Sequence, residues 1–145
     1  MFIAAERHAV VSQDIQQLAD KIAVREVLEE YCLRLEIDDF EAWQNLFTDD
    51  SVYEVFRREL KGREEIKAML SLAPHGVHLG GALRIVLNGD TAETIQNYVF
   101  YGDDPAYNNQ GWYYRTLIRT ADGWKISHTR VKLQKHVKPP VTAEA

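Results

Sequence analysis

The sequence has 145 residues, of which 46% are hydrophobic and 27% are charged, a balance that is typical of one folded domain and excludes an intrinsically disordered chain. The formal net charge of −5 at pH 7 argues against nucleic-acid binding, because such proteins neutralise phosphates with clustered Lys and Arg. No apolar run is long enough to cross a membrane and the N-terminus lacks a signal-peptide core, so we expect a cytoplasmic protein without a membrane partner.

The first predicted element is a long amphipathic helix from Asp14 to about Ile37. Its apolar residues recur at helical spacing and include Val24, Leu28, Tyr31 and Leu35. Ser12 or Asp14 can cap its first amides. We expect residues 1–11, which precede this pattern, to be loosely ordered.

Two shorter helices follow the long one. Asp39 is placed to cap a helix from Phe40 to Phe47, which presents aromatic side chains to the core. A third helix carries apolar residues at i, i+3 and i+4 between Ile66 and Leu70, and Pro74 ends it.

The remaining pattern is that of β-strands. Five strands are predicted, over residues 51–58, 77–87, 92–101, 111–120 and 124–135. The segments Asn88-Gly89-Asp90 and Ala121-Asp122-Gly123 supply the residues that tight hairpin turns need, so the last four strands should form an antiparallel meander. The predicted fold class is therefore α+β, with one domain over residues 1–145 and a loosely ordered tail at 139–145.

Neither a disulfide nor a metal site is expected. Cys32 is the single cysteine, and we expect it to pack as a small hydrophobic residue inside the long helix. His75, His128 and His136 do not have the spacing of metal ligands. The sequence therefore predicts no metal and no cofactor.

Several segments together resemble the SnoaL-like branch of the nuclear transport factor two superfamily, which includes scytalone dehydratase and bile-acid dehydratase. The matching segments are YCLRLEIDDFEAWQNLFTDDSVYEVF at 31–56, GREEI at 62–66, HLGG at 78–81, NGDTA at 88–92 and GWYYRTLIRTADGWKI at 111–126. This resemblance covers nearly the whole chain. It implies a cone-shaped α+β barrel, in which a curved mixed or antiparallel sheet packs on the long helix and encloses a pocket for a small apolar or cyclic molecule.

The resemblance also implies a set of catalytic residues. In dehydratase-like members a strand histidine acts as general base, a carboxylate at the helix end orients it, and tyrosines polarise a substrate carbonyl. These roles map onto His78, Glu36, Tyr53 and Tyr31. The family has Asp where this chain has Glu36, so Asp38 is the alternative partner for the histidine.

Other side chains are candidates for lining the pocket. Trp112 and Tyr114 share one face of their strand and Asn97 can point the same way from its neighbour, so all three are predicted to bind substrate. The basic residues alternate along the last two strands and predict a solvated or interface face, and they are Arg115, Arg119, Lys125, Arg130 and Lys132.

Each catalytic candidate also has a structural interpretation. His78 can be a core histidine bonded to a backbone carbonyl, and Tyr31 and Tyr53 can serve packing alone. Glu36 can be a solvated charge, although a negative charge opposes the dipole at a helix C-terminus.

The resulting hypothesis is a lyase that removes water or a comparable leaving group from a cyclic or polyketide-like carbonyl compound. Two alternatives remain open: an isomerase or cyclase that uses the same pocket, and a non-catalytic ligand-binding or assembly domain like the small subunits of ring-hydroxylating oxygenases. A homodimer or higher oligomer, formed through the exposed sheet face, would suit any of these.

Overall fold

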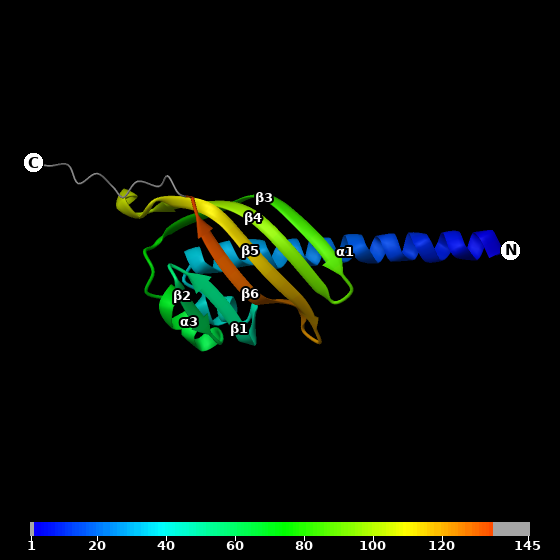
Figure 1. The fold of residues 1–145 in the computed structure, drawn as a ribbon, viewed down its shortest axis with the longest axis horizontal. Coiled ribbons are helices and arrows are strands. Elements are labelled where there is room, and N and C mark those ends of the chain that lie inside the picture. Colours follow the sequence, from blue (N-terminus) through cyan, green and yellow to red (C-terminus); the bar gives the residue numbers. More distant parts are fainter. Residues whose placement is uncertain (1, 135–145) are drawn as a thin grey trace, which may run out of the picture.

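The computed structural model describes residues 2–134, which form one sheet with helices on one face (Figure 1). The helices are α1 (Phe2–Glu36), α2 (Phe40–Gln44), α3 (Arg63–Leu70) and the short 3-10 helix η1 (Pro105–Tyr107). The strands are β1 (Phe47–Val55), β2 (Arg58–Lys61), β3 (Gly76–Asn88), β4 (Thr91–Gly102), β5 (Asn109–Thr120) and β6 (Gly123–Leu133).

The sheet has six strands in the order β2-β1-β6-β5-β4-β3. Strands β3 to β6 form the predicted antiparallel meander, with Gly89 and Gly123 at positive φ in its two tight turns. Strand β1 pairs with β6 in parallel and with β2 antiparallel, so the sheet is mixed. Register shifts in the β3–β4 and β5–β6 pairs mark irregularities of the kind that bend a sheet. The predicted α+β fold with a curved mixed sheet is thereby confirmed.

The core lies between the concave face of the sheet and the C-terminal half of α1. The predicted helix stripe is buried, since Val24, Leu28 and Tyr31 are at most 1% exposed. It packs over strand residues that include Phe47 and Leu117, both fully buried. This packing fixes the end of α1 beside the beginning of β3.

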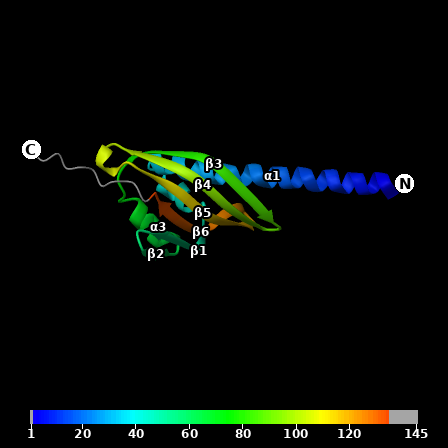
Figure 2. The same ribbon diagram turned by 45° about the horizontal axis from the view of Figure 1, so that its top comes forward.

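The helix α1 begins much earlier than the sequence indicated. It starts at Phe2, so residues 2–11 are helical rather than loosely ordered, and neither Ser12 nor Asp14 is an N-cap. The reason is that residues 2–36 contain no Gly or Pro that would interrupt a helix. The N-terminal half of α1 consequently extends beyond the sheet, as both ribbon views show (Figures 1 and 2).

A charged cluster anchors α1 where it leaves the sheet. Arg119 of β5 donates two hydrogen bonds to the carboxylate of Asp20, at 2.8 and 2.7 Å, and a third to Asp90 at 2.8 Å. The guanidinium also lies 4.7 Å from the ring centroid of Trp124. The cluster joins the helix to two hairpin turns, and Trp124 has a structural role in it.

Smaller differences concern the connection between α2 and α3. Asp39 caps α2 as predicted, accepting a hydrogen bond from the N–H of Ala42 at 3.2 Å, but the helix ends at Gln44. Phe47 begins β1 instead, and β2 was not predicted. The segment 139–145 lies outside the described residues. Within residues 2–134, no helix combines the length and the apolar character that a membrane crossing requires.

Candidate functional site

A cavity of about 310 Å³ opens at the end of the fold where α1 stops. Strands β1, β3, β4, β5 and β6 and helix α3 all contribute to its wall. Most of the wall is apolar, with residues such as Leu35, Val55, Met69, Phe100 and Val131. The polar side chains in the wall include His78, Tyr53, Tyr98 and Tyr113. An apolar cavity with a few convergent polar groups is the usual form of a small-molecule site.

His78 is positioned on β3 as the sequence predicted, in the wall of the cavity. Its ring lies against Phe100, with 4.6 Å between the centroids. Its Nδ1 is buried and has no hydrogen-bond partner among residues 2–134. Burial, together with the nearby positive charge of Arg115, lowers the pKa of His78 to about 4. The imidazole is therefore neutral at physiological pH and can accept a proton.

Glu36 does not contact the imidazole that it was predicted to orient. Its Oε1 accepts a hydrogen bond of 2.6 Å from the backbone N–H of His78. The last residue of α1 lies beside the first residues of β3, and the carboxylate satisfies a strand N–H that would otherwise lack a partner. Asp38 lines the cavity but lies 3.5 Å from Nε2 of His75. Neither proposed carboxylate thus forms a dyad with the ring of His78.

Of the two histidines that line the cavity, His75 at its mouth is the one that contacts carboxylates. Its Nε2 lies 3.0 Å from the carbonyl oxygen of Glu36, to which it donates, and its Nδ1 lies 3.1 Å from a carboxylate oxygen of Asp103. Asp103, the carbonyl of Glu36 and Asp38 all raise the pKa of His75. From the sequence, His75 was a candidate only for metal ligation, because its partners come from α1 and from the loop after β4. Within residues 2–134, no group of three or more acidic, His or Cys side chains is arranged to hold a metal ion.

Tyr31 and Tyr53 are brought together, as the resemblance implied. Their hydroxyl oxygens are 2.8 Å apart, and both side chains are almost completely buried. Tyr53 lines the cavity, whereas Tyr31 does not reach it. Burial raises the pKa of both phenols, so both stay protonated at neutral pH. Tyr53 can therefore donate a hydrogen bond to a molecule in the cavity, while the hydroxyl of Tyr31 donates a hydrogen bond to that of Tyr53.

A buried arginine, Arg115, packs against Tyr31 of this pair, where a solvated or interface side chain was predicted. Arg115 is 1% exposed, with its guanidinium 4.2 Å from the ring centroid of Tyr31 and 3.8 Å from that of Tyr113. It donates one long hydrogen bond, 3.4 Å, to Gln96, and its Nε and Nη2 have no partner among the described residues. The alternation of side chains along β5 was predicted correctly, but the predicted inward set, Trp112 and Tyr114, faces outward. The other set, which includes Arg115, faces inward.

The same inversion moves the three predicted substrate-binding residues away from the cavity. Trp112, Tyr114 and Asn97 do not line it, because Tyr113 and Arg115 occupy the inward positions of β5. Asn97 and Trp112 are paired across β4 and β5 and line a shallow hollow on the outer face of the sheet. The Arg130 guanidinium covers the ring of Tyr114, at 4.7 Å from its centroid. The prediction that these three residues line the cavity was wrong.

Comparison with known proteins identifies relatives for both the sequence and the fold. The family model of the SnoaL-like domain matches residues 16–130. An uncharacterised protein of Mycobacterium tuberculosis is 24% identical over 123 residues, which cover 77% of this chain and 84% of that protein.

Solved structures with the same fold include proteins with and without an assigned activity. An NTF2-like protein with a cystatin-like fold from Novosphingobium aromaticivorans has a TM-score of 0.78 at 22% identity, covering 87% of this chain and 89% of that one. A candidate scytalone dehydratase from the same species has a TM-score of 0.72 at 16% identity, with 85% and 92% covered. A hexachlorocyclohexane dehydrochlorinase from Novosphingobium barchaimii has a TM-score of 0.72 at 17% identity, with 83% and 90% covered.

Proposed function

The chain belongs to the SnoaL-like family, and from that premise we propose that it is a lyase that eliminates water or a comparable group from a small cyclic carbonyl compound. The observation that carries the proposal is the neutral imidazole of His78 in the wall of an apolar cavity that Tyr53 also lines. One group accepts a proton and the other donates a hydrogen bond. Together they meet the needs of proton removal next to a carbonyl.

In the proposed reaction, side chains that line the cavity move the proton and bind the carbonyl oxygen. His78 removes a proton from the carbon next to the carbonyl, and the electron pair of that C–H bond moves toward the carbonyl oxygen to form an enolate. Tyr53 donates a hydrogen bond to this oxygen. When the carbonyl re-forms, the electrons make a carbon–carbon double bond and expel the β-hydroxyl, which takes the proton from His78 and leaves as water.

Arg115 supports the developing negative charge in this scheme. Its buried guanidinium lies against the ring of Tyr31, whose hydroxyl is hydrogen-bonded to that of Tyr53. A cation in a water-poor interior interacts with nearby charge more strongly than a solvated one does. The enolate oxygen at Tyr53 would therefore be stabilised by a hydrogen bond and by a fixed positive charge.

The family comparisons support elimination as the reaction type. One structural neighbour is a dehydrochlorinase and another a candidate scytalone dehydratase, so proteins of this fold are associated with the loss of a small molecule. An isomerase or cyclase would form the same enolate without expelling a group from it. A binding protein would use the cavity without removing a proton.

The test is a screen of hydroxylated cyclic ketones in D₂O. Proton NMR reports exchange at the carbon next to the carbonyl, and mass spectrometry reports loss of water. Exchange with loss of water supports a lyase, exchange alone supports the isomerase alternative, and binding with neither supports the non-catalytic one.

Two histidine variants sharpen this experiment. His78→Gln should lower the rate by about 10²- to 10⁴-fold, the range for removing a general base. His128→Gln is the matched control, because His128 pairs with Glu54 at 2.7 Å and does not line the cavity. Equal activity in the two variants would overturn the role of His78.

A further inference from the structure

The N-terminal half of α1 carries a second apolar stripe that faces solvent. Val11, Ile15, Leu18 and Ile22 are 50–62% exposed. They follow one another at spacings of four, three and four residues, so at about 100° per residue they lie within about 60° of one another on the helix surface. This is the spacing of a coiled-coil seam. Contiguous apolar surface on a soluble protein marks an interaction site more often than chance.

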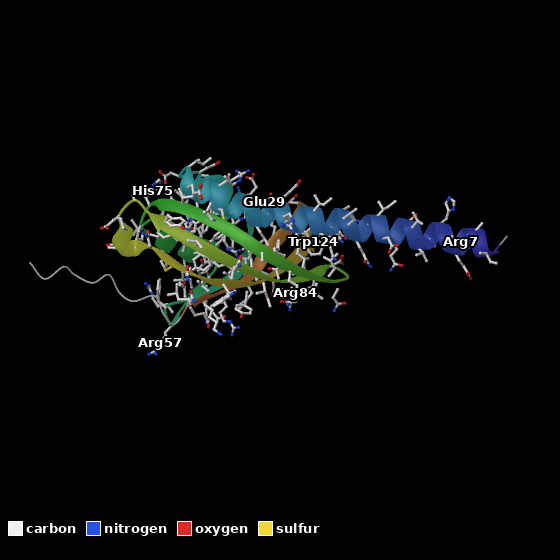
Figure 3. All side chains as sticks on the ribbon, turned by 90° about the horizontal axis from the view of Figure 1, so that it is seen from above. Arg7, Glu29, Arg57, His75, Arg84 and Trp124 are labelled. Carbon is white, nitrogen blue, oxygen red and sulfur yellow. The ribbon has the colours of Figure 1, made fainter. Side chains whose placement is uncertain are left out.

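This stripe is distinct from the buried one that joins α1 to the sheet. The core-facing residues, such as Val24 and Leu28, point in directions at least about 80° away from every residue of the stripe. The stripe begins on the part of α1 that projects past the sheet, near Arg7 and far from His75 at the cavity mouth (Figure 3). Packing within one chain therefore leaves it uncovered.

The charges beside the stripe indicate what covers it. Asp14 and Lys21 lie one helical heptad apart on the same flank, while Ser12 and Ala19 form the opposite, small and uncharged flank. If a second α1 runs antiparallel, with Ile15 opposite Leu18 of the second copy, Asp14 lies beside Lys21 of that copy. The two-fold axis then repeats this pair. In a parallel pairing Asp14 would lie beside Ala19 of the second copy, and no ion pair would form.

The ends of the stripe limit the contact to four layers. One turn beyond Val11 the next seam position is His8, and beyond Ile22 it is Arg25, so the apolar contact stops there. At Ile22 the stripe continues into a shallow groove between α1 and β3, whose floor includes Leu83 and Ile85. Val11 of the second copy would reach this groove. The contact is short, at about 18 Å of helix.

We propose that the exposed stripe of α1 is the interface of a two-fold symmetric homodimer, formed by antiparallel pairing with the same stripe of a second copy. Symmetric self-association is the commonest assembly of soluble proteins, and it uses one patch twice. The proposal concerns a surface outside the cavity and does not depend on the proposed reaction.

Sedimentation velocity of the full chain tests this proposal, at concentrations up to about 300 μM because the interface is small. The wild type should sediment as a dimer, and Leu18→Glu as a monomer with an unchanged far-UV spectrum. Leu72→Glu is the matched control, because Leu72 is 87% exposed and lies outside the stripe. A monomeric wild type, a higher oligomer, or a dimer that survives Leu18→Glu would overturn the proposal.

A charge exchange tests the direction of the helices. Asp14→Lys should weaken the dimer by placing two lysines side by side. Adding Lys21→Glu in the same chain restores opposite charges only in the antiparallel arrangement, so the double variant should regain the wild-type dissociation constant. If it stays as weak as Asp14→Lys, the antiparallel register is wrong.

Discussion

The carboxylate of Glu36, at the last residue of α1, accepts a hydrogen bond of 2.6 Å from the backbone N–H of His78 on β3. The end of the helix is thereby tied to the strand that carries the imidazole. Glu36 makes no contact with the imidazole ring, so it fixes the position of His78 and does not control the protonation of the ring.

Replacing Glu36 should separate an effect on the position of His78 from an effect on the protonation of its ring. Glu36→Gln keeps an oxygen that can accept the bond and should be nearly as stable as the wild type, whereas Glu36→Ala should lose about 1–2 kcal/mol of unfolding free energy. Urea unfolding measures the difference. In Glu36→Gln the pKa of the His78 ring, measured by NMR, should stay near its wild-type value. A markedly lower pKa in this variant would show that the carboxylate does act on the ring.

The two histidines of the cavity should titrate in opposite directions from the ordinary value. His78 should have a midpoint of about 4, because burial and the charge of Arg115 disfavour its protonated form. His75 should titrate above 6.5, because Asp103 and the carbonyl of Glu36 favour the charged ring. Histidine ring signals followed by NMR from acidic to alkaline pH measure both values. Coincident midpoints would contradict the structure.

The depressed pKa of His78 also predicts how stability changes with pH. Between about pH 6.5 and pH 4 the unfolded chain binds a proton at this residue and the folded chain does not, so stability falls as the pH falls through this window. The raised pKa of His75 has the opposite effect on stability, which rises as the pH falls. A variant of one histidine alone separates the two effects. His78→Gln should lose less stability than the wild type between pH 7 and about pH 4.5, as urea unfolding will show; an equal loss would count against burial of the neutral ring.

The tyrosine pair should contribute unequally to catalysis. Tyr53→Phe removes the hydroxyl of the tyrosine that lines the cavity, and kcat should fall about 10²-fold, as for loss of one hydrogen bond to an oxyanion. Tyr31→Phe removes only the supporting hydroxyl and should have a smaller effect. Steady-state kinetics with a substrate from the screen compare the two variants, and a larger effect at Tyr31 would contradict the arrangement.

Arg115 should be important for activity but not for stability. It forms no ion pair with the rest of the described chain, and replacing a buried charge with an apolar group of similar size is often neutral or stabilising. We therefore expect Arg115→Met to unfold at the same urea concentration as the wild type or a higher one, while kcat/KM decreases. A loss of 3 kcal/mol or more, roughly the effect of breaking a buried pair, would show that the guanidinium has a structural partner.

Asp20 should stabilise the junction between α1 and the sheet. Hydrogen bonds from Arg119 lower the pKa of this carboxyl, so its stabilising effect is present above its usual pKa of 3.8 and is lost as the pH falls through the still lower folded value. Asp20→Asn should therefore melt below the wild type at pH 7, and the difference should shrink at about pH 3. The exposed Asp50→Asn is the control and should melt like the wild type at both pH values.

Local sequence signals predicted the meander well and the inward face of β5 poorly. Turns with Gly89 and Gly123 have a backbone requirement that the sequence displays directly. Along β5, in contrast, both sets of alternating residues contain aromatic side chains, Tyr113 on one face and Trp112 with Tyr114 on the other. Charge suggested that Arg115 faces water, and only stacking between tyrosines from distant elements makes its burial possible.

Two other features were missed for different reasons. Strand β2 is four residues long and follows a turn in which Phe56 and Arg57 have positive φ, so no Gly or Asn marks it. The His75 contacts join a helix end to a loop that is distant in the sequence. Such meetings depend on the tertiary arrangement and leave no periodic signal.

The position of β6 in the sheet has a consequence for how the protein folds. It is the last strand of the described chain, yet it lies between β1 and β5 and is the sole connection of the β1–β2 hairpin to the other described strands. Its parallel pairing with β1 joins residues 76 to 79 positions apart, and such distant pairings slow folding. During synthesis on the ribosome the sheet cannot close until β6 has emerged, so the β1–β2 hairpin and strands β3 to β5 remain separate until then, with apolar surfaces uncovered.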